Sequence, residues 1–113
     1  MFDLHMYINI EYLLQLNEKH NLIVIFGGEV NPSDRGHEGA GGFSSDVVLI
    51  NEDTFEIKTL SNGGTKDWPI TRGWSSGSTG TGNNHLVIFG GLTGDDKTPI
   101  RLNDLWICTV DTK

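Results

Sequence analysis

The sequence predicts an all-β fold, and two observations lead to that prediction. The first is an internal repeat, because residues 22–28 (LIVIFGG) return as residues 86–91 (LVIFGG). The second is the use of glycine: 15 glycines against 3 prolines fall at turns between short apolar runs. Together they indicate two successive units, each built from short antiparallel strands.

The repeated segments are expected to form the inner strands of each unit. Residues 22–26 and 86–89 are continuous apolar runs of β-branched and aromatic residues, which is typical of strands buried on both faces. The pairs Gly27-Gly28 and Gly90-Gly91 then end these strands, since glycine accepts positive φ and close backbone contact.

The first unit continues through a polar loop to Asp46 and a strand at 47–50. Residues 51–54 (NEDT) favour a hairpin turn because their side chains bond to nearby backbone. Alternating apolar and polar residues at 55–60 then predict a half-exposed outer strand.

The second unit begins near Arg72, with a small-residue strand at 75–81 and a turn at 82–84 before the repeated inner strand. Asp104 precedes its third strand, as Asp46 does in the first unit. We interpret both aspartates as groups that cap a turn or loop in each repeat.

The domain organisation divides at residue 20. Residues 1–20 are an N-terminal extension, or they supply a substitute first strand through residues 12–16, which also fit a short helix. Residues 21–113 hold the repeats, the first unit spanning about 12–62 and the incomplete second unit about 70–110.

Charge and hydropathy exclude two classes of partner. The formal net charge is −7, with 15 acidic against 8 basic residues, so the surface should repel nucleic acid. Apolar runs are too short for a membrane span, and no basic start marks a signal peptide. We expect a soluble, cytoplasmic protein. The single cysteine, Cys108, lies in an apolar run and is expected to be a buried, unreactive thiol.

Three motifs resemble those of kelch proteins: residues 25–28 (IFGG), residues 103–106 (NDLW), and Arg72-Gly73 before a hairpin. Kelch proteins fold as β-propellers of four-stranded blades. The resemblance covers residues 21–110 and implies a partial propeller of about one and two-thirds antiparallel blades. Ile57 stands where the fourth strand of a kelch blade usually has a tryptophan. About four to eight blades close a propeller, so the open edges should be covered by the rest of a propeller or by self-association.

The loop after Gly27-Gly28, together with residues 71–75 (TRGWS), is similar to the C-terminal blades of the plant specifier proteins of the nitrile-specifier, epithiospecifier and thiocyanate-forming types. In that family a Glu, an Asp and a His of this loop bind ferrous iron, which directs the breakdown of a glucosinolate aglucone. The resemblance implies Glu29, Asp34 and His37 as metal ligands. The family's aspartate position is occupied here by Ser33, and Asp34 is one residue later.

By the same resemblance, Arg72 and Trp74 would face a small sulfur-containing substrate, in an iron-dependent, lyase-like specifier activity. Two carboxylates and one imidazole suit ferrous iron or another divalent ion. Other interpretations stay open. Glu29, Asp34 and His37 also fit a solvated polar loop. Arg72 also fits an ion pair with a carboxylate, and Trp74 also fits packing between blades. The chain as a whole fits a non-catalytic module that binds a protein partner, or a truncated fragment without function.

Overall fold

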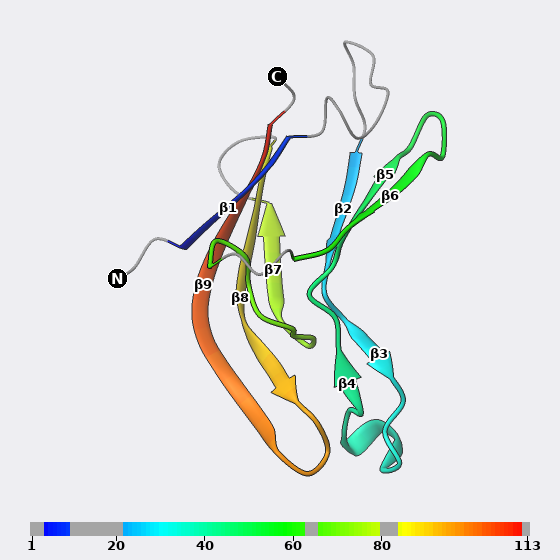
Figure 1. The fold of residues 1–113 in the computed structure, drawn as a ribbon, viewed down its shortest axis with the longest axis vertical. Coiled ribbons are helices and arrows are strands. Elements are labelled where there is room, and N and C mark those ends of the chain that lie inside the picture. Colours follow the sequence, from blue (N-terminus) through cyan, green and yellow to red (C-terminus); the bar gives the residue numbers. More distant parts are fainter. Residues whose placement is uncertain (1–3, 10–21, 63–65, 80–83, 112–113) are drawn as a thin grey trace.

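A computed structural model describes residues 4–9, 22–62, 66–79 and 84–111. These residues form three β-sheets and a short 3₁₀ helix (Figure 1), and pairing within the sheets is antiparallel except at one strand. The all-β prediction is therefore confirmed. In the described ranges no helix is long and apolar enough to cross a membrane.

The first sheet consists of β2 (Leu22–Phe26), β5 (Val47–Asn51) and β6 (Ile57–Leu60), in that order. The expected turn at 51–54 is present, because the Asn51 side chain accepts hydrogen bonds from the Asp53 and Thr54 amides. The outer strand is shorter than expected. Phe55 adopts a φ of 60°, which belongs to the turn and not to a strand.

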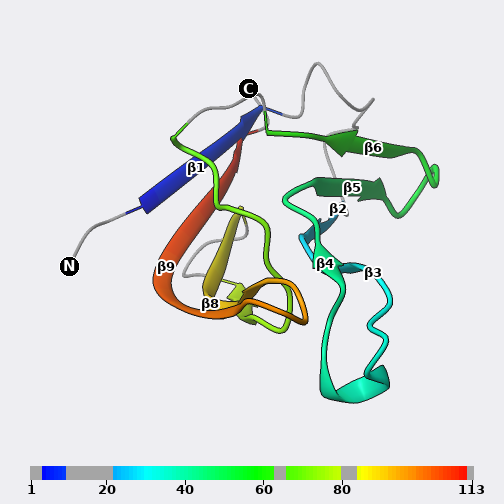
Figure 2. The ribbon, with the colours of Figure 1, turned by 60° about the horizontal axis from the view of Figure 1, so that its bottom comes forward.

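A hairpin extends from one end of the first sheet (Figure 2). It pairs β3 (Glu29–Asn31) with β4 (Gly42–Phe43), and the 3₁₀ helix η1 (Gly36–Glu38) lies in the loop between them. The loop that carries the predicted metal ligands is thus an extension of the first sheet.

The second sheet has the order β1-β9-β8-β7, with β1 (Leu4–Asn9), β7 (Ser76–Thr79), β8 (His85–Gly94) and β9 (Pro99–Asp111). The prediction that a glycine pair ends the inner strand is wrong for this unit. β8 runs through Gly90-Gly91, with a register shift between Phe89 and Gly91, because β9 continues beside it.

The N-terminal strand changes the expected organisation. β1 pairs in parallel with β9, so it adds a fourth strand to the second unit, for which the sequence predicted three, and this sheet is not wholly antiparallel. A pairing between the two ends of the chain has no local signature, which is why the sequence did not reveal it. Residues 10–20, including the alternative strand or helix at 12–16, and residues 82 and 83 of the predicted turn lie outside the described residues.

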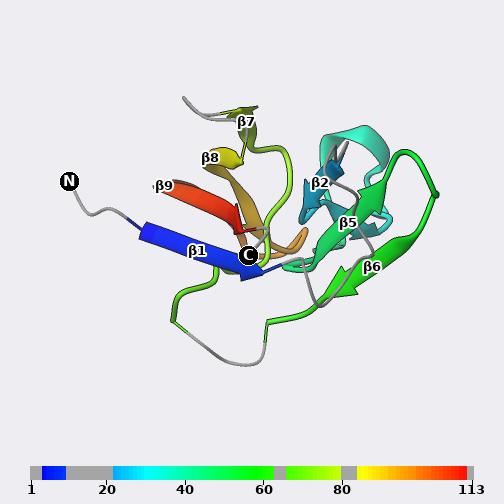
Figure 3. The same cartoon turned by 90° about the horizontal axis from the view of Figure 1, so that it is seen from above.

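The two sheets enclose one hydrophobic core (Figure 3). Val47 and Leu49 of β5 are fully buried in it, and Trp106 and Cys108 of β9 meet them from the second sheet. Each large apolar side chain buried in this way contributes about 1.5–3 kcal/mol. The expectation for Cys108 is confirmed, since its thiol is buried and this burial raises its pKa to about 12.

The inner strands are half-buried, not buried on both faces as predicted. Along β2, Ile23 and Ile25 are 41% and 46% exposed, and Phe89 of β8 is 51% exposed. Only the faces that the two sheets turn toward each other are covered, because the third described sheet, β3–β4, extends from the end of the first sheet and covers neither outer face (Figure 2).

Candidate functional site

Arg72 lies at the junction of the two repeats, and its backbone belongs to the first. Its carbonyl oxygen accepts a hydrogen bond of 2.8 Å from the Gly28 amide, and its own amide donates to the Ser44 carbonyl at 3.1 Å. The residue is only 1% exposed. The segment entering the second sheet is thereby fixed to the end of β2.

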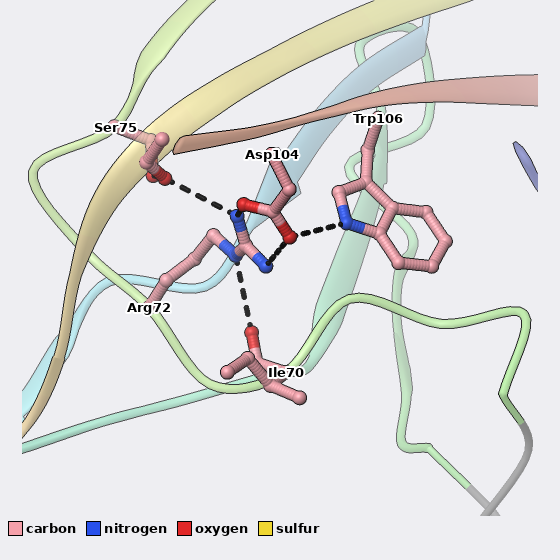
Figure 4. Close-up of polar contacts among 6 residues, drawn as sticks. Ile70, Arg72, Ser75, Asp104 and Trp106 are labelled. Atoms are coloured by element: carbon pink, nitrogen blue, oxygen red, sulfur yellow. Dashed lines mark hydrogen bonds and ion pairs between the residues drawn. The ribbon is translucent and has the colours of Figure 1, made fainter. Parts of the chain in front are cut away.

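The Arg72 side chain belongs to the second repeat (Figure 4). Its two terminal nitrogens donate to the two carboxylate oxygens of Asp104 at 2.6 and 2.8 Å. It also donates to the Gly90 carbonyl at 3.2 Å, and Nε donates to the Ile70 carbonyl. A two-pronged pair of this kind is strong and directional.

Asp104 is therefore the partner of a buried arginine and not a turn cap, which corrects the interpretation from the sequence. It also accepts a hydrogen bond of 2.9 Å from Trp106 Nε1. The hydrogen bond from Arg72, followed by that from Trp106 and the charge of Arg72, lowers the pKa of Asp104 against the opposing effect of burial. This corresponds to the ion-pair interpretation of Arg72. Direct contact between Arg72 and a substrate stays a prediction.

Trp74 is presented by a short, constrained segment. Gly73 and Leu92 exchange backbone hydrogen bonds of 3.0 and 2.9 Å, which joins the segment to β8. Trp74 then adopts a φ of 55°, a left-handed conformation that costs a non-glycine residue about 1–2 kcal/mol. Trp74 is 52% exposed, and its ring packs edge-to-face with the Phe43 ring, with centroids 6.3 Å apart. The strained backbone of Trp74 thus holds an aromatic side chain toward solvent.

Two open hollows meet at Trp74. The larger, of about 530 Å³, lies against the loop between β3 and β4 and is bordered by Glu29, Pro32, Ser33, Gly36 and Gly39. The smaller, of about 190 Å³, lies between that loop and the tip of the β8–β9 hairpin. Its charged lining residues are Arg35, Glu38, Asp95, Asp96 and Arg101.

A hydrogen bond joins the two loops beside these hollows. Ser33 Oγ lies 2.8 and 2.7 Å from the two carboxylate oxygens of Asp96 on the β8–β9 hairpin. A Cβ at Gly39 would meet this carboxylate, so a side chain there would require the Asp96 side chain to move. Sequence reasoning missed Ser33 and Asp96, because nothing in either loop signals a partner in the other.

The three predicted metal ligands lie in different surroundings. Glu29 is exposed and borders the larger hollow, whereas Asp34 is exposed in the following turn and does not line it. The His37 side chain lies outside the described part of the structure. Among the described residues, no group of three His, Cys, Asp or Glu side chains could hold a metal ion. The donor types suit ferrous iron, but their assembly around it stays a prediction.

Comparison with known proteins gives an informative similarity. No family model matches the chain, and no solved structure matches it. Over 71 residues the chain is 32% identical to N-(sulfonatooxy)prop-2-enimidothioate sulfolyase of Thlaspi arvense, a specifier-type protein. The similar region covers 61% of this chain and 20% of that protein. The chain thus has a distant, partial relative among the specifier-type proteins.

Proposed function

We propose that this chain is a specifier-type module, built as two adjacent blades of an open kelch propeller, that binds a small sulfur-containing compound of glucosinolate breakdown. The observation that carries the proposal is the 32% identity to the Thlaspi arvense sulfolyase. That protein's name specifies a small anionic substrate that contains sulfur. A cytoplasmic location belongs to the same proposal.

The larger hollow is the proposed binding site. Its volume of about 530 Å³ falls within the range of roughly 300–1,000 Å³ that small-molecule sites occupy. Trp74 and Glu29 both line it, Trp74 with an exposed aromatic ring and Glu29 with a carboxylate. In this proposal Trp74 contacts the substrate, and Arg72 positions Trp74 by fixing the segment that carries it.

The test of substrate binding uses N-(sulfonatooxy)prop-2-enimidothioate released from its parent thioglucoside in the assay. We expect the 113-residue chain with ferrous iron to shift the ratio of breakdown products, measured by gas chromatography, away from the ratio without protein. Trp74→Ala should abolish the shift. The control is Phe55→Ala, because Phe55 is also an exposed aromatic residue at positive φ but lies on the β5–β6 turn.

An unchanged product ratio with the wild-type chain would contradict the proposed activity. If Phe55→Ala and Trp74→Ala reduced the shift in product ratio equally, the loss would reflect a general effect on folding. Trp74 would then not be assigned to the binding site.

Iron binding is the second part of the proposal, with Glu29, Asp34 and His37 as ligands. Ferrous iron added under anaerobic conditions should raise the melting temperature of the chain. A ligand present at a concentration 100 times its Kd stabilises the folded state by about 2.7 kcal/mol. Glu29→Gln and His37→Gln should each remove the rise. Glu52→Gln, at an exposed carboxylate on the β5–β6 turn, is the matched control. The same rise in all variants would exclude this ligand set.

A further inference from the structure

Each sheet has an apolar outer face that no other described element covers. On the first sheet this face holds Ile23 and Ile25 of β2, which lie opposite Ile50 and Val48 of β5. Ile57 of β6 lies opposite Ile50 and extends the same face. We call these five residues the first outer face. All are aliphatic, and Ile57 is more than half exposed.

The second sheet has a corresponding surface on the side away from the core. Val87 and Phe89 of β8 lie opposite Ile107 and Leu105 of β9. We call these four residues the second outer face. Phe89 is its most exposed member, and Ser76 of β7 lies directly opposite Phe89.

The sequence repeat matches the outer face of each sheet to the core-facing side of the other sheet. Matching Phe26-Gly27 to Phe89-Gly90 pairs Val24 with Val87 and Ile25 with Ile88. Val24 and Phe26 pack against the core between the sheets, whereas their counterparts Val87 and Phe89 form the second outer face. In the other direction, Ile88 is buried in that core, whereas its counterpart Ile25 is exposed.

The third strands repeat this relation independently. Matching Asp46 to Asp104 pairs Val47 and Leu49 with Leu105 and Ile107. Val47 and Leu49 are buried in the core, and their counterparts lie on the second outer face. Likewise Trp106 and Cys108 are buried, and their counterparts, Val48 and Ile50, lie on the first outer face.

By the sequence repeat, each sheet has two faces that correspond to the two faces of the other sheet. At the internal junction, the core between the sheets, the first sheet uses one of these faces and the second sheet uses the non-corresponding one. The described residues leave one face of each kind exposed. We propose that the second outer face of one copy of this chain packs against the first outer face of another copy, repeating the internal junction. This interaction goes beyond the proposed small-molecule function and does not depend on it.

The composition of the two faces fits a second copy as the occupant. None of their nine residues is charged, although the chain carries 15 acidic residues. Apolar surface of this kind on a soluble protein marks an interaction site. The two faces differ, so the contact is head-to-tail and propagates until it closes into a ring. About four to eight blades close a propeller, which corresponds to roughly two to four copies of a two-sheet unit.

The test measures the mass of the 113-residue chain by sedimentation velocity over a range of concentrations. We expect the wild type to form a closed assembly of at least two copies. Ile25→Glu disables the first outer face, and Phe89→Glu disables the second, so each variant alone should be monomeric. A mixture of the two variants should form a one-to-one dimer that grows no further, because each supplies the intact face that the other lacks.

Ile100→Glu is the matched control, because Ile100 is 50% exposed on the β8–β9 hairpin, outside both faces. It should assemble as the wild type does. The proposal is overturned if the wild type is monomeric throughout, as it would be if these faces serve only further blades of a longer chain. It is also overturned if either Glu variant assembles normally, or if folded variants, checked by circular dichroism, fail to combine. Ile25→Ser and Phe89→Ser provide a milder pair should a glutamate variant not fold.

Discussion

The two glycine pairs have nearly the same backbone but different roles. Gly27 and Gly28 have φ of 71° and 106°, and Gly90 and Gly91 have φ of 62° and 107°. After the first pair the chain forms a separate hairpin with a long loop, whereas after the second pair β8 continues to Gly94. The repeat therefore specifies the bend at the strand end, and the segments that follow determine what the bend is used for.

Arg72 contacts both glycine pairs, and this makes the repeats unequal. Its carbonyl accepts from the Gly28 amide, and its guanidinium donates to the Gly90 carbonyl and to Asp104. Asp46, the counterpart of Asp104, takes part in no ion pair within the described part of the chain. One arginine thus serves two repeats, and only the second repeat supplies its carboxylate.

The largest expected effect comes from removing the carboxylate that only the second repeat supplies. Asp104→Ala leaves the buried guanidinium of Arg72 without its counter-charge, and should lower the free energy of unfolding by about 3 kcal/mol. Asp46→Ala is the matched change in the other repeat and should cost less than about 1 kcal/mol. Urea denaturation of the two variants gives the comparison. Equal losses would show that Asp104 acts through the repeat position that it shares with Asp46, and not through Arg72.

The next effect separates crowding from backbone strain. Gly28 and Gly91 have φ values that differ by one degree, so alanine is strained alike at both. A Cβ at Gly28 would have no atom within 4 Å, whereas at Gly91 it would lie 2.6 Å from the Gly73 carbonyl oxygen. Overpacking costs about 1–3 kcal/mol, so Gly91→Ala should be less stable than Gly28→Ala by about 2 kcal/mol. Indistinguishable urea midpoints for the two variants would contradict the close packing of Gly91 against the segment before Trp74.

A smaller effect concerns two tryptophans whose indole N–H groups donate hydrogen bonds at or beside the matched aspartates, Trp68 in the first repeat and Trp106 in the second. Trp68 Nε1 donates to the Ser45 carbonyl at 2.6 Å in the first repeat, as Trp106 donates to Asp104 in the second. Trp68→Phe keeps most of the ring and removes the donor, so it should cost about 1 kcal/mol. Trp106→Phe should cost more because its acceptor is charged. The reverse order in thermal unfolding would count against this comparison.

The sequence predicted the parts of the fold that local patterns determine. The apolar runs before the glycine pairs identified β2 and β8, and the polar residues after Ile50 identified the β5–β6 turn. The pairing of β1 with β9 and the ion pair of Arg72 with Asp104 depend on residues far apart in the chain. Such contacts follow from tertiary packing, which a periodicity within one segment cannot reveal.

In the candidate site, too, some features follow from local sequence and others depend on contacts between distant segments. Glu29 and Trp74 were identified from their own segments, and the structure places both at the larger hollow. The hydrogen bond between Ser33 and Asp96 joins two loops, and no spacing rule connects them. The exposure of Ile25 and Phe89 was also unpredictable, because an apolar run does not say how many of its faces the rest of the molecule covers.

The smallest expected effect is a change in the Asp104 contribution with pH. Because the hydrogen bond from Arg72 lowers the folded-state pKa of Asp104 below its ordinary value of 3.8, the carboxylate stabilises the fold fully above that value. This stabilisation is lost as the pH falls through the lowered pKa. The difference in unfolding free energy between the wild type and Asp104→Asn should therefore be constant near neutral pH and narrow below about pH 3.8. Urea titrations at a series of pH values measure it. A difference that persists unchanged into the acid range would mean that Asp104 stabilises the junction by the shape of its side chain and not by its charge.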